Sequence, residues 1–324
     1  MCTAITYQTR DHYFGRNLDL EYSYHEVVTV TPRNYPFHFR KTTGLKTHYA
    51  MIGMAHVADG FPLYYEATNE TGLSMAGLNF PDNADYKPEA PNKDNVAPFE
   101  FIPWLLGQCA DLAQARELLA RVNLIRLPFS ADLPLSPLHW MISDQSGSIT
   151  VECVRGGLWV YDNPVGVLTN NPPFDFQMLN LTNYMGLSRD APVNRFCPEL
   201  DLKPYCLGMG AMGLPGDLSS ASRFVRAAFT RLNSVSGGSE SESVSQFFHI
   251  LGSVAQQRGC VRLENGSYEV TLYSSCCNTD RGVYYYTTYE NSQITAVDMH
   301  REDLNGQTLS VYPLITGQQI RTQN

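Results

Sequence analysis

Residues 2–20 read CTAITYQTRDHYFGRNLDL, and this stretch decides how the fold begins. Two runs that alternate apolar and polar side chains flank TRDH, whose composition is typical of a turn. The pattern predicts a tight β-hairpin centred near Arg10 and Asp11. Such a hairpin places Cys2 roughly opposite Asp19, so that a thiol and a carboxylate meet at one end of it.

Cys2 directly follows the leading methionine, and two explanations of this position compete. It can be a small, half-buried residue of the first strand. Alternatively, Met1 is removed and Cys2 becomes the N-terminus, with its thiol and a free amine on one carbon. The second explanation predicts a nucleophile, because an α-amine titrates at roughly 7.7–8.0 and can take the thiol proton without a histidine.

The other groups that this chemistry needs are present in the chain. Asp19 can hold the amine, and Arg16 on the same strand can favour the thiolate. Oxyanion donors can come from asparagines at strand ends, as in AGLNF with Asn79 and VLTNNPP with Asn170. Arg223 in SSASRF falls in the first turn of an expected helix. Each residue also has an ordinary explanation as a surface ion pair, a turn residue or a solvated cation.

The remaining sequence alternates groups of strands and helices without a clear linker. The segments expected to be strands are 48–57, 63–69, 73–80, 138–144, 148–154, 158–162, 165–171, 268–277, 282–289 and 294–299. The segments expected to be helices are 111–123, 219–232 and 242–256. Capping-box patterns join Asp111 with Gln114 and Ser239 with Glu242. We therefore expect a single α+β domain of layered sheets over residues 1–324.

Composition and charge exclude several classes of protein. The 324 residues are 43% hydrophobic and carry a formal net charge of -9 without a basic block, so we expect no nucleic-acid partner. No apolar run reaches the length of a membrane span, and we expect no membrane anchoring. The chain starts without a charged leader and apolar core of a signal peptide, which predicts a cytoplasmic protein.

Patterns for cofactors and metals are incomplete. GMGAMG at 208–213 matches a dinucleotide motif by letters, but no strand leads into it and no helix follows, so we interpret it as a glycine-rich loop. The eight histidines show no metal-binding spacing, and the eight cysteines form no C-x-x-C pair. We expect neither a metal nor a cofactor. His139 lies in an apolar strand, where we expect a hydrogen-bonded structural residue more than a partner of a catalytic cysteine.

Eight motifs carry a resemblance to a known family. In chain order they are MCTAI, FGRNLD, GLNFP, PLHWMISD, GVLTNNP, GLPGDLSSASRF, SQFFHIL and YYYTTYENSQITAVDM. With these motifs the sequence resembles the choloylglycine hydrolases, which are bacterial bile salt hydrolases. They are N-terminal nucleophile hydrolases with penicillin V acylases as close relatives. The resemblance covers essentially the whole chain and implies a four-layer αββα sandwich whose nucleophile is exposed by removing Met1.

The resemblance also implies a role for each candidate residue. The matching positions are Cys2 as nucleophile, Arg16 beside the thiol, Asp19 orienting the amine, Asn79 and Asn170 on the oxyanion side, and Arg223 as a second supporting cation. None of these positions is substituted in this sequence. The asparagine at position 79 resembles bile salt hydrolases, whereas penicillin V acylases typically carry tyrosine there.

The implied reaction is hydrolysis of the amide bond in glycine- and taurine-conjugated bile salts, through a thioester on Cys2. The apolar residues expected to contact the steroid are Leu20, Tyr24, Phe61, Phe129, Leu133 and Leu135, for which ordinary core packing is the alternative. The family suggests a homotetramer. Other possible functions are an acylase for penicillin V or acyl-homoserine lactones, a catalytically silent binding protein, and redox sensing through the adjacent Cys276 and Cys277.

Overall fold

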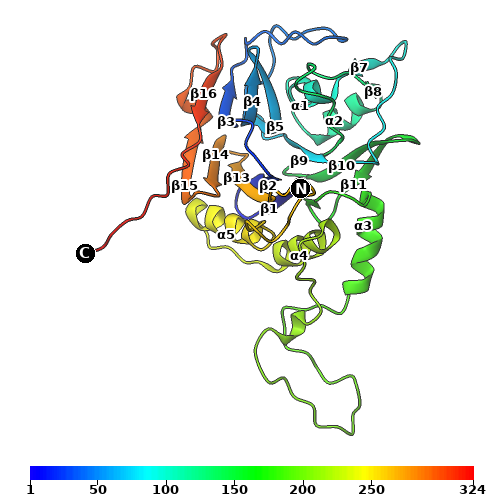
Figure 1. Ribbon diagram of the computed structural model, residues 1–324, viewed down its shortest axis with the longest axis vertical. Coiled ribbons are helices and arrows are strands. Elements are labelled where there is room, and N and C mark those ends of the chain that lie inside the picture. The colour runs from blue at the N-terminus through cyan, green and yellow to red at the C-terminus, as the bar shows by residue number, and fades with distance from the viewer.

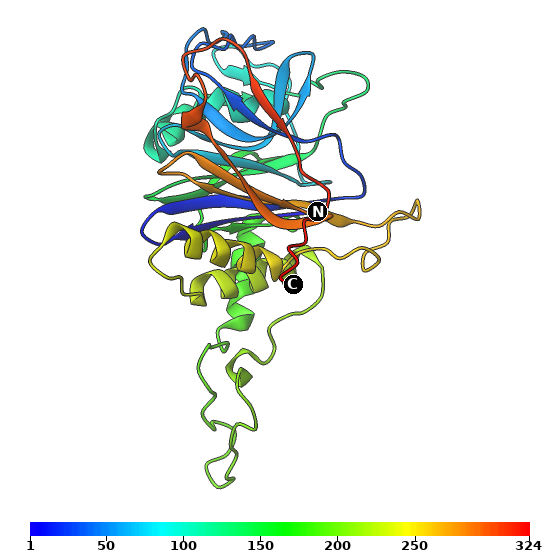
Figure 2. The same ribbon diagram turned by 90° about the vertical axis from the view of Figure 1, so that its left-hand side faces the viewer.

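Two β-sheets pack face to face between two layers of helices, in a computed structural model that describes residues 1–324 (Figure 2). In spatial order, the strands of the first sheet are β12 (Val167–Leu168), β1 (Cys2–Gln8), β2 (His12–Leu20), β13 (Val270–Asn278), β14 (Val283–Thr288) and β15 (Asn291–Asp298). Those of the second sheet are β11 (Gly157–Asp162), β10 (Gly147–Val154), β9 (Leu138–Asp144), β6 (Ser74–Asn79), β5 (Phe61–Asn69), β4 (Met51–Ala58), β3 (Val27–Thr31) and β16 (Ser310–Pro313). The expected αββα sandwich is confirmed.

Helices cover the outer face of each sheet (Figures 1 and 2). On the second sheet these are α1 (Phe101–Leu106) and α2 (Leu112–Leu119), and on the side of the first sheet α3 (Phe174–Leu181), α4 (Ser220–Asn233) and α5 (Glu240–Gly252). Short 3₁₀ turns are η1 (Pro98–Glu100), η2 (Thr182–Tyr184), η3 (Met209–Ala211) and η4 (Met299–Arg301). No helix is both long enough and apolar enough to cross a membrane.

The first sheet is covered on both faces, and its sequence reflects this. β1 and β2 are buried over almost their whole length, because α4 and α5 lie on one face and the second sheet on the other. A second core lies between the other sheet and the helices α1 and α2. Cys2, at the start of β1, is therefore placed in the interior of the molecule and not at a sheet edge.

Most expected elements are present, with differences at the ends. The helix expected at 111–123 ends at Leu119, because Val122–Leu124 forms β8 and pairs in parallel with β7 (Asp94–Val96). Its cap Asp111 accepts from the Gln114 N–H, but the Gln114 side chain reaches the N–H of Ala110 and not that of Asp111. Five further elements, β3, β7, β16, α1 and α3, were not expected from the sequence, because their short runs show no clear periodicity.

A long excursion, residues 185–219, leaves the body between η2 and α4 (Figures 1 and 2). It contains the glycine-rich loop, which carries only the 3₁₀ turn η3 and no strand–turn–helix unit. Its large apolar side chains are exposed to a degree unusual for a folded chain, with Phe196 at 85% and Leu207 at 98%.

Candidate active site

Cys2 is the first residue of β1 and is 3% exposed. Its Cα partner on β2 is Leu18, one residue before the expected Asp19. The difference arises because the loop of three residues at 9–11 is centred on Arg10, half a residue earlier than expected. Asp19 still lies beside the start of the chain, since its N–H donates to the carbonyl oxygen of Met1 at 2.9 Å.

Asn170 and Arg223 converge on the main chain of Cys2. The Cys2 N–H donates to Asn170 Oδ1 at 2.8 Å, and Arg223 Nη2 donates to the same oxygen at 2.8 Å. Arg223 Nη1 donates to the carbonyl oxygen of Cys2 at 2.5 Å. All three residues are buried, so these charge-assisted contacts are shielded from water. Two distant chain segments thus fix the main chain on both sides of the Cys2 Cα.

Asn170 is also joined to Asn79. Asn170 Nδ2 donates to the carbonyl oxygen of Asn79 at 2.7 Å, and the second N–H of this amide remains for a further acceptor. Asn79 ends β6, and its side chain is exposed. The structure therefore brings together the two asparagines, which are 91 residues apart in the sequence.

The first turn of α4 holds both Asn170 and Arg223 in place. Ser219 caps the helix, and its side chain accepts from the Ser222 N–H. Ser220 Oγ accepts from the Asn170 N–H at 2.8 Å and donates to Thr169 Oγ1 at 3.0 Å. The sequence analysis placed Arg223 in this first turn but did not single out Ser220, although the serine pair SS at the helix start was the available signal.

Asp19 is fully buried on β2. Its Oδ1 accepts from Thr271 Oγ1 at 2.6 Å, whereas its Oδ2 has no hydrogen-bond partner. Burial raises the pKa of this carboxyl, and the positive charges of Arg223, the N-terminal ammonium and Arg16 act against the rise. An unpartnered carboxylate oxygen at this depth is available for a cationic amine.

Arg16 is fully buried between the two sheets. Its Nη1 donates to the carbonyl oxygens of Gly77 at 2.5 Å and Tyr65 at 3.1 Å, while Nη2 has no partner. Burial alone would lower the pKa of Arg16, but the negative charges of Cys2, Tyr273, Glu66 and Asp19 raise it. Arg16 therefore stays charged and holds one donor free.

Gly15 allows Arg16 to reach this position. A side chain at Gly15 would collide with the carbonyl oxygen of Ser275 on β13. The close approach of β2 and β13 therefore requires a residue without a Cβ. It also explains why the FGRN motif has glycine directly before the arginine.

Glu66 on β5 is a buried acid that the sequence analysis missed. It accepts hydrogen bonds from Tyr273 Oη at 2.8 Å, Ser275 Oγ at 2.9 Å and Tyr284 Oη at 2.5 Å. Its Oε2 lies 3.8 Å from Arg16 Nε. Burial raises the pKa of Glu66, and Arg16 and the three hydroxyl groups oppose this. The network joins the two sheets directly behind Arg16.

Met1 covers Cys2 in the structure. Its ammonium donates to the Asp19 carbonyl oxygen at 2.6 Å and forms an ion pair with Glu269. Burial lowers the pKa of this ammonium, against the opposite effects of Cys2 and Asp19. The nitrogen of Cys2 is an amide as long as Met1 is attached, so it becomes an amine only when Met1 is removed.

The apolar candidates do not form one group. Phe61 and Phe129 lie 6.3 Å apart between ring centroids, and Phe99 contacts both. Arg40 lies over the Phe99 and Phe129 rings and donates to the main chain at residues 128 and 129. This cluster fixes the start of the loop between β8 and β9.

The other four candidates lie in different surroundings. Leu20 packs against the first core, and Leu135 packs against the second. Tyr24 is 36% exposed and pairs with another surface tyrosine, while Leu133 lies half-buried in the loop after β8. Leu20 and Leu135 thus have the core packing that was the alternative for these residues.

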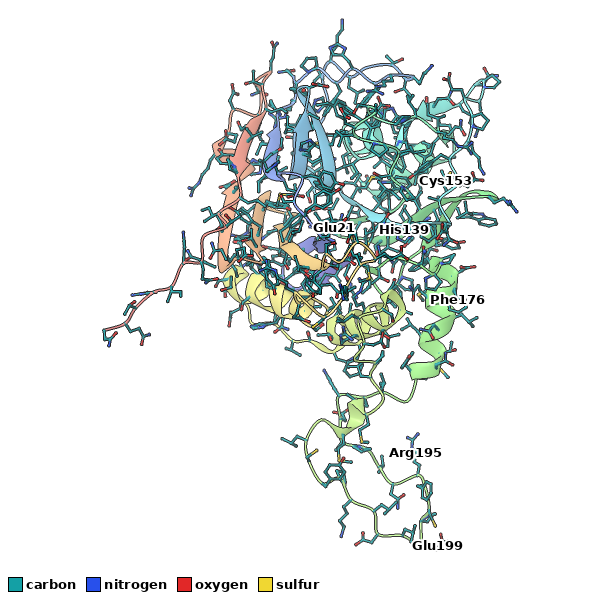
Figure 3. All side chains as sticks on the ribbon, viewed as in Figure 1. Glu21, His139, Cys153, Phe176, Arg195 and Glu199 are labelled. Carbon is teal, nitrogen blue, oxygen red and sulfur yellow. The ribbon has the colours of Figure 1, made fainter.

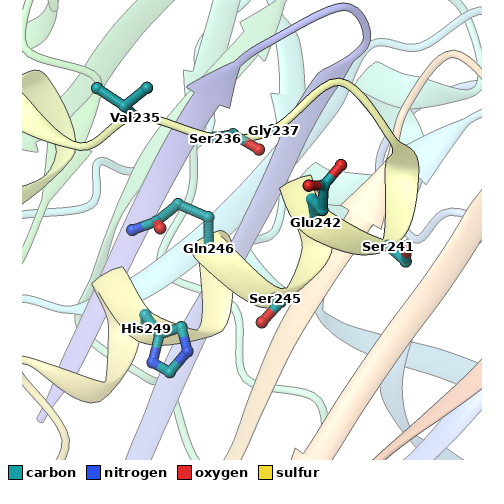
Figure 4. A pocket seen from close by; sticks show the side chains of 8 residues that line it. All are labelled: Val235, Ser236, Gly237, Ser241, Glu242, Ser245, Gln246 and His249. Carbon is teal, nitrogen blue, oxygen red and sulfur yellow. The ribbon is translucent and has the colours of Figure 1, made fainter.

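A surface hollow of about 410 Å³ lies elsewhere, along the start of α5 (Figure 4). Serine and glutamine side chains line it, together with Glu242 and His249. It is open and polar, without the apolar walls that a steroid needs. No group of three or more His, Cys, Asp or Glu side chains is arranged to hold a metal ion.

Comparison with known proteins identifies the class of protein. Residues 2–312 match the family described as "Linear amide C-N hydrolases, choloylglycine hydrolase family". The bile salt hydrolase/transferase of Lactiplantibacillus plantarum is 57% identical over 97% of both chains. The bile salt hydrolase/transferase of Clostridium perfringens is 39% identical over 96% of both chains.

Solved structures agree with the sequence relatives. A mutant conjugated bile acid hydrolase from Clostridium perfringens superposes with a TM-score of 0.92 at 37% identity, covering 100% of both chains. Penicillin V acylase from Agrobacterium tumefaciens shares the fold, with a TM-score of 0.74 at 20% identity over 96% of this chain and 90% of its own. The protein is a linear amide C–N hydrolase. Within that class, the chain belongs to the choloylglycine hydrolase family.

Proposed function

We propose that this enzyme hydrolyses the amide bond of glycine- and taurine-conjugated bile salts, with Cys2 as its nucleophile. The convergence of Asn170 and Arg223 on the nitrogen and carbonyl oxygen of Cys2 is the observation that carries the proposal. A structural cysteine in a strand needs no such set of charge-assisted contacts. The names of the relatives at 57% and 39% identity support the substrate class.

Removal of Met1 is the first step of this proposal. It frees the Cys2 amine, which keeps Asn170 Oδ1 as its acceptor. Because Met1 no longer occupies the space beside Asp19, the amine can also interact with the Asp19 carboxylate. The amine takes the thiol proton, and the Cys2 sulfur attacks the amide carbonyl carbon. The guanidinium of Arg16, beside the thiol, favours the thiolate.

Asn79 and Asn170 stabilise the oxyanion in this proposal. The free N–H of Asn170 and the side chain of Asn79 donate to the oxygen of the tetrahedral intermediate. When this intermediate collapses, the C–N bond breaks, and the amine of Cys2 returns the proton to the departing glycine or taurine nitrogen. Water, deprotonated by the same amine, then cleaves the thioester and releases the bile acid.

The apolar part of the substrate needs walls near Cys2. We propose that Phe61 and Phe129 form one of them, since their rings contact each other beside the loop that leads to β9. Leu20 at the end of β2, Tyr24 shortly after it, and Leu133 and Leu135 in the loop that leads to β9 are kept as further contacts in this proposal. Leu20 and Leu135 are only half-buried, so packing on a core leaves part of each side chain for a substrate.

The decisive experiment measures free glycine and taurine released from glycocholate and taurocholate by the purified protein. Release from either substrate, together with an intact mass that lacks Met1, supports the proposal. No release from either by protein that lacks Met1 would contradict it. In that case penicillin V, and then acyl-homoserine lactones, become the substrates to test, because the same nucleophile can accept other acyl groups.

Acyl transfer is a second candidate activity, which the names of both relatives favour. The Cys2 thioester reacts with an amine as well as with water, forming a new amide and freeing the thiol. Incubation of cholic acid conjugates with an excess of a different amino acid, followed by mass spectrometry, tests whether a new conjugate appears.

We further propose that residues 1–324 work as one catalytic domain in the cytoplasm and assemble into a homotetramer. The eight cysteines are all unpaired, as is usual in a reducing compartment. The exposed apolar side chains of the excursion at 185–219 supply a surface for contact between subunits.

A further inference from the structure

His139 on β9 and Glu152 on β10 form a fully buried pair in the second sheet. Figure 3 places His139 inside the body of the molecule, among the strands. Its Nδ1 lies 3.0 Å from Glu152 Oε1, and its Nε2 lies 2.9 Å from the carbonyl oxygen of Thr169. Thr169 directly precedes Asn170, so the ring contacts the backbone that carries a proposed oxyanion residue.

Both ring nitrogens of His139 face acceptors, and a neutral histidine beside a carboxylate has only one proton for these two contacts. One further proton is required. The carbonyl oxygen of Thr169 can only accept, so His139 Nε2 carries a hydrogen. Neutral imidazole would then present the lone pair of Nδ1 to the Glu152 oxygen, and two acceptors would face each other. The short Nδ1–Oε1 distance of 3.0 Å therefore needs a proton between these atoms.

The surroundings place this proton on the histidine. Glu152 Oε1 also accepts from the Phe174 N–H at 3.1 Å, and a hydrogen bond donated to a carboxylate favours its ionised form. The Phe80 ring is stacked on the imidazole, with centroids 4.2 Å apart and planes 6° from parallel, and its face attracts a cation.

His12 provides a contrast within the same molecule. It is also buried and uses both ring nitrogens, with Gln8 Oε1 2.8 Å from Nδ1 and Ser143 Oγ 3.0 Å from Nε2. The serine hydroxyl, which also donates to the Gly147 carbonyl oxygen at 2.8 Å, and the Gln8 amide can each act as donor or acceptor towards the ring. No contact therefore requires a proton on both nitrogens of His12, and no carboxylate touches the ring. Six strand positions separate His12 from Leu18, the partner of Cys2, which corresponds to about 20 Å.

We propose that His139 is a positioning residue, held as an imidazolium by Glu152, that fixes the Thr169 carbonyl and thereby the Asn170 amide beside Cys2. The proposal rests on the function proposed above. Tyr161 from β11 lies near Glu152 and near Asp175 of α3. Glu152 is the anion in contact with the ring, while Arg223 from α4 donates to Asn170 Oδ1.

The protonation state is tested on the unmodified enzyme by ¹⁵N NMR of histidine-labelled protein at pH 7.5. We expect both ring nitrogens of His139 to carry protons and one nitrogen of His12 to lack one, with assignment by His139→Gln and His12→Gln. An unprotonated ring nitrogen on His139 at this pH would overturn the assignment. This measurement does not depend on the substrate.

The positioning role is tested with Glu152→Gln, which keeps the shape of the side chain but has no negative charge to hold an imidazolium. We expect kcat for glycocholate to fall about tenfold or more, with KM within about twofold, because the oxyanion contact matters in the transition state. His12→Gln, the matched control, should lose stability without losing kcat. Equal kcat values in Glu152→Gln and wild type, or a change in KM alone, would refute the role. If wild-type protein releases no glycine, the proposed function fails, and the NMR result alone decides the ion pair.

Discussion

At the scale of the residue, the Cys2 site is built from charged side chains in the interior, where an unpaired charge costs free energy. Arg16, Asp19 and Arg223 are each fully buried. Two of them keep a side-chain atom without a partner, Nη2 in Arg16 and Oδ2 in Asp19. Unsatisfied polar atoms in a native interior usually mark a place where function requires a group to be free.

Replacing Cys2 by alanine should abolish bile salt hydrolysis while the fold is kept. The side chain is small and makes no hydrogen bond of its own, so its loss should change the free energy of unfolding by only about 1 kcal/mol. Amine release and thermal unfolding measure the two effects. Appreciable turnover by folded Cys2→Ala would rule out Cys2 as the nucleophile.

Replacing Asn170 by alanine should lower kcat about 100- to 1000-fold, the cost of losing an oxyanion donor. The variant also deprives Arg223 Nη2 of an acceptor, so a modest loss of stability is expected. Initial rates with glycocholate and a denaturation curve separate the two. An Asn170→Ala enzyme with the kcat of wild type would show that the oxyanion is held by other groups.

Sequence reasoning found some of these residues and missed others for physical reasons. The hairpin pattern alone brought Cys2 close to Asp19, since a tight turn fixes which residues face each other. Asn170 was named as a candidate donor from its place at a strand end, but its contact with Cys2 was not predicted, because no local pattern shows a contact across 168 residues. Glu66 and Glu152 were missed because an isolated acid in a strand normally faces water. His139 was expected to be a hydrogen-bonded structural residue, and its buried contacts confirm this.

At the scale of the element, the β1–β2 hairpin carries the proposed nucleophile at one end and a buried histidine at the other. Cys2 lies at the first, and His12 lies at the second, beside the turn. Burial lowers the pKa of His12 to about 4, although Asp280 and Asp144 oppose this. The hairpin therefore holds a neutral histidine in its folded state at a pH where the unfolded chain would protonate it.

This difference predicts that acid weakens the fold through His12. The folded pKa lies below the ordinary 6.5, so the stabilisation is present above pH 6.5 and is lost as the pH falls towards 4. The full loss is about 3 kcal/mol at roughly 1.4 kcal/mol per pKa unit. Urea denaturation at pH 7 and pH 4.5 measures it. His12→Gln should show a flatter dependence, and an identical pH dependence in both proteins would contradict the explanation.

The loop between β8 and β9 allows a second prediction at this scale. Phe129 contacts Phe61 and Phe99, and Arg40 holds the main chain beside it. If Phe129 contacts the steroid, Phe129→Ala should raise KM for glycocholate about tenfold or more, since a buried phenyl group contributes about 1.5–3 kcal/mol. The protein should remain folded, and an unchanged KM would remove Phe129 from the substrate pocket.

At the scale of the whole molecule, the layered sandwich could be predicted from the sequence, whereas the excursion at 185–219 could not. The layered sandwich follows from strands and helices that alternate along the chain, each with one or two apolar faces. The excursion at 185–219 has no periodicity, so its extension away from the body was not expected. Its shape depends on what surrounds it, and within one chain it has little to pack against.

The excursion therefore predicts the state of assembly. Large apolar side chains exposed at 80% or more, among them Phe196 and Leu207, would be costly in a monomer, and we expect the proposed tetramer to bury them between subunits. Sedimentation should give a mass about four times the 36.3 kDa of one chain. Phe196→Asp with Leu207→Asp should lower this mass, because charges in a subunit interface are strongly unfavourable.

The matched control is Val311→Asp. Val311 is also apolar and is 48% exposed, but it lies on the edge strand β16, outside the excursion. If the control dissociates the assembly and the double variant does not, the subunits meet through the sheet edge and not through the excursion.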